Sequence, residues 1–281
     1  MKIIEPKVEL LSELDITPES HIARCARVCY GKEYKEPNQE ADEKMVDGLI
    51  KRGHRSMLRH ASRYMRCDNV QPDSTADWFE VCPYNHVYHQ DSSIYISTNC
   101  QEERYGENFN YAYCDKSYSP EEFLDLCKDK PELFYIFRLT FCITTQISTS
   151  RELNRVSPNA IAERSTRYCS SKDGLEICKP WWYDEDTLAR DMYKANMEYL
   201  ETAYKYLLGA GMKPEDARGI LPLDTATKVI YTYSIREWQH ILDLRYYGTT
   251  GKPHPNAKLI AGKIRDEINK FAIEHGINYK V

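Results

Sequence analysis

The chain has 281 residues, of which 42% are hydrophobic and 29% are charged, and its formal net charge is −5. A chain of this length can bury a sizeable core, as one domain with or without an insertion. The acidic balance excludes a general basic field for nucleic acid or an anionic membrane, so any anion site must be local. No basic start precedes an apolar run, which predicts a cytoplasmic protein.

Amphipathic or extended patterns predict four elements early in the chain: helices at 19–30 and 39–53, and extended segments near 60–67 and 91–97. Between about 68 and 130, Asp, Asn, Ser, Pro and Tyr predominate without a sustained period. This composition predicts a loop-rich insertion, with one short helix after Pro120, rather than a separate domain.

The ten cysteines occur without any CxxC pair, so we expect buried, reduced thiols rather than disulfides. Within the predicted insertion, Cys82, His86 and His89 have a spacing that resembles a metal site. A fourth ligand and the usual paired cysteines are missing, so we predict no metal.

The second half contains further regular patterns. They predict a long helix at 184–208, a short helix between Pro214 and Pro222, a strand at 228–234, a helix from Ser234 as N-cap, and a last helix at 256–274. Helices and strands alternate without internal repeats. The predicted class is therefore α/β (α+β), a mixed central sheet flanked by helices, in a single domain of residues 1–281.

One stretch, RELNRVSPNAIAERSTRY at 151–168, contains four arginines despite the acidic balance of the chain. Arg151 and Arg155 are four apart, so a helix would place them on one face. Further on, Glu163, Ser165 and two arginines lie close together, as a turn around a phosphate requires. Guanidinium groups and a hydroxyl suit a phosphate, and a Glu suits a base or sugar hydroxyl. The alternative is a solvated helix face with ion pairs.

The stretch resembles the signature of flavin-dependent thymidylate synthases, in which Arg-His-Arg is followed by seven residues and a Ser, and then by Arg-Tyr. Arg155 matches the first Arg and Ser165 the Ser, and the closing pair falls on Arg167 and Tyr168. Segments elsewhere resemble other family motifs in the same order: IKRGHRSMLRHAS, ARGILP and SIREWQHILDLR.

The resemblance implies an enzyme that converts dUMP to dTMP, with methylenetetrahydrofolate as carbon donor and FAD reduced by NADPH. It also implies the fold of that family and a homotetramer whose sites are shared between subunits. No enzyme cysteine attacks the substrate in this family, so none of the ten thiols is needed for catalysis.

The resemblance also assigns site residues. Nucleotide-binding positions fall on Arg155, Glu163, Ser165, Arg167, Arg218 and Arg245. Arg245 also takes the catalytic position, where a cation favours the N3-deprotonated uracil and makes C5 nucleophilic. Flavin-binding positions fall on His60, Ser62, Ser234, Arg236 and His240. On a continuous α-helix Arg236 and His240 share a face, whereas Arg245 points about 140° away from His240.

Two departures leave alternatives open. Val156 and Ser157 replace the His and the second Arg of Arg-His-Arg, which hold the flavin in the family, and Ser234 replaces an Asn. One alternative is a related flavin methyltransferase that acts on another pyrimidine nucleotide. Another is a nucleotide-binding homologue without catalysis. A nucleic-acid-binding role is disfavoured because the chain has no basic stripe.

Overall fold

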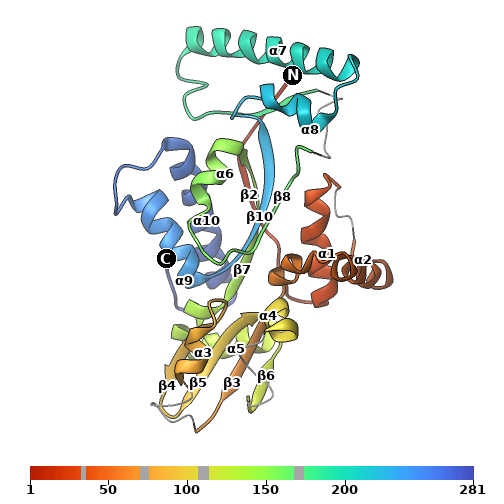
Figure 1. Cartoon of the computed structure of the whole chain (residues 1–281). Helices are drawn as coiled ribbons and strands as arrows, with labels where there is room; N and C mark the ends of the chain where they lie inside the picture. Colours follow the sequence, from red (N-terminus) through yellow and green to blue (C-terminus); the bar gives the residue numbers. More distant parts are fainter. Residues whose placement is uncertain (33–35, 70–75, 107–113, 168–173) are drawn as a thin grey trace.

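The computed structural model describes residues 1–32, 36–69, 76–106, 114–167 and 174–281. Its centre is a four-stranded sheet with antiparallel pairings (Figure 1), in the order β2 (Lys7–Leu10), β7 (Arg138–Gln146), β10 (Ala226–Ser234) and β8 (Ile161–Glu163). β7 is buried along its whole length, and each of its nine residues is paired with one of β10. These two strands form the middle of the molecule.

Helices flank this sheet, and the predicted fold class is confirmed. Figure 1 shows α1 (Pro18–Cys29) and α2 (Gln39–Lys51) on one side, and α6 (Ile147–Leu153), α9 (Ile235–Leu242) and α10 (Pro255–Glu274) on the other. The helices predicted at both ends of the chain are therefore present. α10 buries one face, which includes Ile260, Ile264 and Ile268, against the sheet and α9.

The part of the chain near Figure 1's upper edge contains the long helix α7 (Thr187–Gly209) and the short α8 (Pro214–Ala217), which continues into η4 (Arg218–Ile220). Both helices were predicted. A parallel pair, β1 (Lys2–Ile4) and β9 (Glu176–Cys178), lies beneath them. None of the described helices combines the length and apolar character needed to cross a membrane.

The prediction of a loop-rich insertion is wrong. Residues in this region form most of a second antiparallel sheet, in the order β4 (His86–Gln90), β5 (Ser93–Asn99), β3 (Ser62–Cys67) and β6 (Lys116–Tyr118), with helices α3 (Ala76–Val81), α4 (Cys100–Tyr105) and α5 (Pro120–Asp129). The extended segments predicted near 60–67 and 91–97 are confirmed as β3 and β5, whereas β4 and β6 were not predicted. β5 continues beyond the predicted segment into Thr98 and Asn99 and, like Ser97, these residues are polar yet buried. Ser97, for example, accepts a hydrogen bond from Arg138 Nε at 3.0 Å.

One apolar core continues from the second sheet into the central one. Tyr64 of β3 stacks on Phe123 of α5 with ring centroids 4.4 Å apart, and on Phe137 at 5.4 Å. Phe137 closes the turn η3 (Pro131–Ile136), which leads directly into β7. The assignment of residues 1–281 to a single domain stays a prediction, and the continuous core agrees with it.

The predicted helical face shared by Arg151 and Arg155 does not form. α6 ends at Leu153, and Arg155 lies beyond the helix. Pro158 follows two residues after Val156, and a proline disfavours helical geometry in the residue before it. The two arginines are therefore held by different backbone geometries.

The segment after β10 forms a helix for a local reason. Ser234 caps α9, as predicted: its Oγ accepts from Glu237 N at 3.2 Å, and Glu237 Oε2 accepts from Ser234 N at 2.7 Å. However, the helix does not continue in α geometry to Arg245. Residues Asp243–Tyr247 form a π-helical turn, η5, which ends at Gly248 with a φ of 75°. The angle of 140° between His240 and Arg245, which assumes an uninterrupted α-helix, is therefore wrong.

We predict that Ser234→Ala lowers the free energy of unfolding by about 1–2 kcal/mol, because it removes the cap and leaves the half-buried Glu237 carboxylate with one partner fewer. Urea denaturation would measure the change. Ser119→Ala is the matched control, since Ser119 forms the same capping box on α5 at an exposed site. An equal loss in both variants would contradict a special role for the buried cap.

Candidate nucleotide and flavin site

The structure brings together three of the predicted nucleotide-binding residues. Arg218 Nη1 donates to Thr166 Oγ1 at 3.0 Å, across 52 residues of sequence. Arg167 Nη2 lies 3.1 Å from Glu215 Oε2, while Glu215 O accepts from Arg218 Nε. The backbone N–H of Arg167 donates to Ser165 Oγ at 3.2 Å. Two guanidinium groups and a hydroxyl thus meet at an exposed corner between β8 and α8, as an oxyanion site requires.

Two more of the predicted residues, Arg155 and Arg245, lie near the C-terminal end of α6. Arg245, in η5, donates from Nε to Glu152 O at 2.7 Å, near the last turn of α6. Arg155 follows the same helix and is exposed. Here the carbonyl of Glu152 holds one edge of the Arg245 guanidinium. The side chain therefore has a fixed direction, and no carboxylate among the described residues forms an ion pair with it.

Glu163 lies between these two groups. Its Oε1 accepts from Ser150 Oγ of α6 and from Thr227 Oγ1 of β10, each at 3.0 Å. Both partners are neutral donors, so the carboxylate is oriented by hydrogen bonds rather than by an ion pair. Tyr168, which closes the family signature, lies outside the described residues.

The predicted flavin-binding residues divide into a buried set and an exposed set. His60 is fully buried, and its Nδ1 lies 2.9 Å from Thr232 Oγ1. Ser62 and Ser234 are also buried and use their hydroxyls within the chain. Arg236 and His240 are exposed on α9. Thus two of the five fit contacts with the phosphates of a flavin dinucleotide, and the other three do not face solvent.

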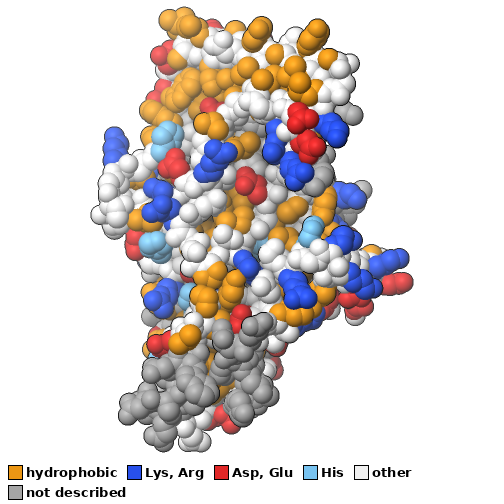
Figure 2. Space-filling model, in the orientation of Figure 1, with side chains coloured by type: hydrophobic (Ala, Val, Ile, Leu, Met, Phe, Trp, Pro, Cys, Tyr) orange, Lys and Arg blue, Asp and Glu red, His pale blue; other side chains and the backbone are white. Residues whose placement is uncertain are grey.

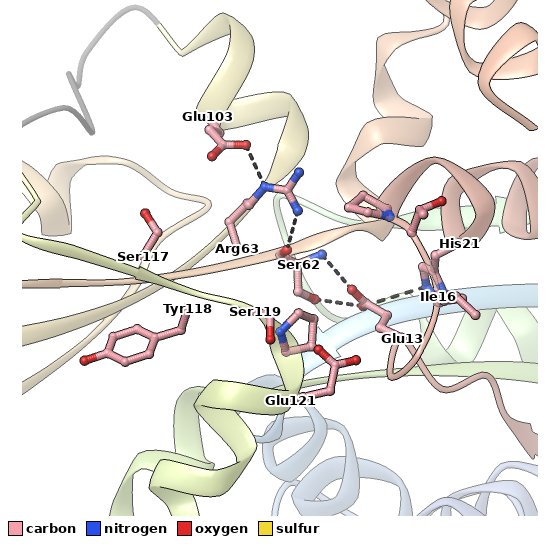
Figure 3. Close-up of a pocket in the computed structure, with 13 residues that line it drawn as sticks. Glu13, Ile16, His21, Ser62, Arg63, Glu103, Ser117, Tyr118, Ser119 and Glu121 are labelled. Carbon is pink, nitrogen blue, oxygen red and sulfur yellow. Dashed lines mark hydrogen bonds and ion pairs between the residues drawn. The ribbon is translucent and has the colours of Figure 1, made fainter. Parts of the chain in front are cut away.

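Ser62 borders a pocket of about 380 Å³ that the sequence did not indicate (Figure 3). Glu13 Oε2 accepts from Ser62 N at 2.9 Å, and Glu13 Oε1 accepts from Ser62 Oγ at 2.8 Å. His21 Nε2 lies 3.7 Å from the same carboxylate, and Arg63 Nε pairs with Glu103 at 2.7 Å. In the sequence, Glu13 is one of several acids in a polar segment, and no pattern distinguishes it.

Burial controls the protonation of this pocket wall. It raises the pKa of Glu13, although the two hydrogen bonds from Ser62 oppose the shift. Burial also lowers the pKa of His21 well below its usual value, and the charge of Arg24 acts in the same direction. The neutral forms of both groups are therefore favoured more than they would be in water.

A line of hydrogen bonds crosses the central sheet from this pocket to His60. His21 Nε2 lies 3.1 Å from Thr140 Oγ1 of β7, which lies 2.8 Å from Thr232 Oγ1 of β10. Thr232 in turn contacts His60. The two threonines are directly opposite in the β7–β10 register, so the strand pairing itself sets this line.

Two histidines of the region predicted as an insertion, His86 and His89, each lie beside a carboxylate. His86 Nε2 lies 3.1 Å from Glu237 Oε2. Although burial opposes ionisation of Glu237, the hydrogen bond and charge of His86 lower the pKa of this carboxyl to about 2. His89 pairs instead with Glu80 at 2.9 Å. Within the described ranges, no group of three His, Cys, Asp or Glu side chains is placed to hold a metal ion.

A comparison with models of known protein families identifies the family of this chain. A family model described as thymidylate synthase complementing protein matches residues 9–134 and 131–272. The chain belongs to this family. The matched ranges include both arginine groups and the pocket around Ser62.

Several curated relatives are named flavin-dependent thymidylate synthase. The Halobacterium salinarum protein is 39% identical over 64 residues, which are 22% of this chain and 26% of that protein. The Geobacter sulfurreducens protein is 30% identical over 99 residues, 35% and 43% of the two chains. The Synechocystis protein is 25% identical over 181 residues, 54% and 81% of the two. The chain thus spans less than half the length of the first two relatives.

Among solved structures, the chain is similar to the UMP/dUMP methylase PolB from Streptomyces cacaoi, in a crystal structure bound with 5-Br dUMP. The TM-score is 0.47 at 15% identity, over 98% of this chain and 95% of that one.

We predict that stability falls as the pH is lowered from 6.5 to 4. Burial lowers the pKa of His60 to about 4, so the unfolded chain binds this proton first. The stabilisation is complete above pH 6.5 and is lost as the pH falls towards 4, by up to about 3 kcal/mol. The buried His21 acts with the same sign, and Glu13, with its raised pKa, acts with the opposite sign.

Urea unfolding of wild type and His60→Gln at several pH values would measure this effect. Glutamine keeps a polar group near Thr232 but does not titrate, so the slope between pH 6.5 and 4 should decrease. His89→Gln, at an exposed ion pair, is the control. An unchanged slope in His60→Gln would show that another group sets the acid sensitivity.

Proposed function

We propose that this protein is a flavin-dependent thymidylate synthase, which methylates dUMP reductively to dTMP. Methylenetetrahydrofolate would donate the carbon, and FAD reduced by NADPH would be the reductant. The observation that carries the proposal is that Arg167 and Arg218 both contact Glu215, and that Arg218 also bonds to Thr166, next to Ser165. Arg218 is far from Ser165 and Arg167 in the sequence, and all three occupy positions that the family uses for the nucleotide.

In this proposal, the corner formed by Ser165, Arg167 and Arg218 binds the nucleotide phosphate. Two guanidinium groups offer paired N–H donors to a dianion, and the hydroxyl offers a third direction. Glu215 neutralises part of this charge in the absence of ligand, because its carboxylate lies 3.1 Å from Arg167 Nη2. Phosphate binding would replace that exposed ion pair, which itself contributes little to stability.

Arg245 would act on the uracil ring. Its Nε donates to Glu152 O, and no hydrogen bond joins the two terminal nitrogens to another described residue, so both could face a ligand. A fixed cation beside the ring stabilises the N3-deprotonated form and raises electron density at C5, which is the carbon that is methylated. Such a preorganised charge can contribute several kcal/mol in a site without bulk water. Bound flavin supplies the hydride for the reductive step, and Arg236 and His240 would hold its phosphates.

The division of the predicted residues favours a site shared between subunits. One group lies between β8 and α8, whereas Arg155 and Arg245 lie at the end of α6. In a homotetramer, as we propose, the phosphate corner of one copy would complete the α6 group of another. Residues of a neighbouring copy would add further flavin contacts to those of Arg236 and His240 on α9.

A second candidate is a nucleotide-binding homologue without catalysis. It is favoured by the internal bonding of His60, Ser62 and Ser234, and by Val156 and Ser157 at family positions that hold the flavin. A related flavin methyltransferase for another pyrimidine nucleotide is the third, since the proposed roles of these residues concern the phosphate and the base, and none of them is assigned to the sugar.

The absorption spectrum of the purified protein, after addition of FAD and desalting, separates these candidates. A synthase should retain the two flavin bands in the visible and near ultraviolet, and dUMP should perturb them because both ligands share one site. UMP and dCMP are the matched nucleotide controls. A colourless protein that still binds dUMP would contradict the synthase and favour the non-catalytic homologue.

We predict that Arg245→Ala keeps dUMP binding within about tenfold but lowers the rate of methylation at least a hundredfold, as the loss of a transition-state cation should. Single-turnover assays on the FAD-loaded protein would measure the rate, and calorimetry the binding. Arg190→Ala, on the surface of α7, is the control. Turnover near the wild-type rate in Arg245→Ala would remove this residue from the mechanism.

A further inference from the structure

Two cysteine side chains meet at one end of the second sheet. Cys67 is the last residue of β3, and Cys114 lies two residues before the start of β6. Both are free thiols, and their Sγ atoms are 2.7 Å apart across 47 residues of sequence. A disulfide bond is about 2.0 Å long, so the two sulfur atoms need only a small displacement to become bonded.

The backbone brings these two thiols together. β3 and β6 are antiparallel, and the last residue pair of their ladder is Arg66 with Lys116. One step further, Asp115 Oδ2 accepts a hydrogen bond from Asp68 N at 2.6 Å. The segment before β6 is therefore still tied to the segment after β3 at the place where the sulfur atoms meet. Strand pairing, rather than a chance side-chain contact, sets the position of the two thiols.

The two thiols differ in exposure. Cys67 is 4% exposed, in an apolar cluster with Phe79, Ile94 and Ile96. Cys114 packs against the same cluster but is only half-buried. A dissolved oxidant can therefore reach Cys114, while the sulfur of Cys67 is placed to react with Cys114 itself.

The surroundings favour the reduced form of Cys67 until an oxidant arrives. The hydrogen bond between the two sulfur atoms raises the pKa of the Cys67 thiol, and burial and the charges of Asp115 and Asp68 act in the same direction. Because the thiolate is the reactive form of cysteine, Cys67 is a poor first nucleophile. Within the part of the chain that the structure describes, no third ligand turns this pair into a metal site.

We propose that Cys67 and Cys114 are a dithiol site that a small oxidised disulfide, such as glutathione disulfide, converts into a disulfide bond within the chain. The Cys114 sulfur attacks one sulfur of the reagent, which releases one glutathione and leaves a mixed disulfide on Cys114. The Cys67 sulfur then attacks the Cys114 sulfur and releases the second glutathione. Two cysteine thiols are oxidised, one glutathione disulfide is reduced to two thiols, and the two cysteine protons pass to the released glutathione sulfurs.

The bond would fasten the edge of the second sheet. β6 has three residues and pairs with β3 alone among the described strands. A short edge strand is held by few hydrogen bonds, so a covalent tie beside its first residue restrains it strongly. Ser117 and Tyr118 of β6 also line the pocket beside Ser62 (Figure 3). Oxidation would therefore restrain one wall of that pocket.

The dithiol site lies away from the nucleotide site proposed above. Figure 1 places the second sheet at the lower end of the molecule and α8 near the upper end. The phosphate corner between β8 and α8 lies in that upper part, where Figure 2 shows basic and acidic side chains gathered near α8. The proposal thus does not depend on the activity proposed for the nucleotide site.

Peptide mapping of the native protein tests the bond. The protein is incubated with glutathione disulfide, the remaining thiols are alkylated in denaturant, and the digest is analysed by mass spectrometry. We expect a cross-linked pair of peptides that joins Cys67 to Cys114 and disappears after treatment with dithiothreitol. Cys29→Ser is the control, because Cys29 is also half-buried but lies on α1, and its removal should leave the cross-link intact. A digest without this pair, or with Cys67 joined to another cysteine, would overturn the proposal.

Removing one thiol at a time tests the order of the two steps. Cys67→Ser should stop at the mixed disulfide, so glutathione should accumulate on Cys114. Cys114→Ser should leave Cys67 largely unmodified, because the Cys67 thiol is buried. Equally fast glutathione addition to the remaining cysteine in both variants would contradict the assignment of Cys114 as the first nucleophile.

Thermal unfolding tests the effect on the sheet. The oxidised wild type should have a Tm roughly 5–10 °C above that of the reduced protein, since the bond closes a long loop in the unfolded chain. Dithiothreitol should abolish the difference, and Cys114→Ser should show none after the same treatment. A Tm that stays constant on oxidation of the wild type would overturn the proposed restraint of β6.

Discussion

The pairing of β7 with β10 is the constraint on which the rest of the structure depends. The nine-residue register fixes where each strand ends, and the described site elements begin at those ends. β7 leads into α6, which holds Arg245 through Glu152 O, and β10 leads into α9 through the Ser234 cap. A slip of one residue would turn the side chains of one strand to the opposite face and separate Thr140 from Thr232.

The sheet also determines which polar groups are buried together. Thr140 and Thr232 lie in the middle of the paired strands, between His21 on one side and His60 on the other. Buried hydroxyls need partners, and the two histidines supply them. The low pKa of His60 is therefore a property of the fold as much as of a site, because the ring is placed where hydration is lost.

Local signals in the sequence were sufficient to predict most helices and the point at which β10 ends. The Ser234 cap and the helix after Pro120 depend on neighbours a few residues away, and both were predicted correctly. In the second sheet, β3 and β5 were predicted as extended segments, whereas β4 and β6 were not. The evidence for the rest is tertiary, because Ser97 and Asn99 are buried at the end of β5 where Arg138 and the helix α4 provide hydrogen bonds to them.

The candidate site shows the same division. The family motif assigned Arg167 and Arg218 to one ligand, and the structure places them together. The motif could not indicate that the Ser62 hydroxyl donates to Glu13, because that partner is brought near by the packing of a distant segment. It also could not indicate that the Ser234 hydroxyl is bonded within its own helix cap.

The π turn at Asp243–Tyr247 changes the direction in which Arg245 points relative to His240. A π turn holds one residue more than an α turn over the same rise, and so it acts as a one-residue insertion within a helix whose ends are both anchored. Ser234 fixes the start and Gly248 the end. A homologue shortened by one residue here would keep every chemical group and yet point its arginine elsewhere, so in this segment the length of the chain sets the direction of the arginine as much as residue identity sets its charge.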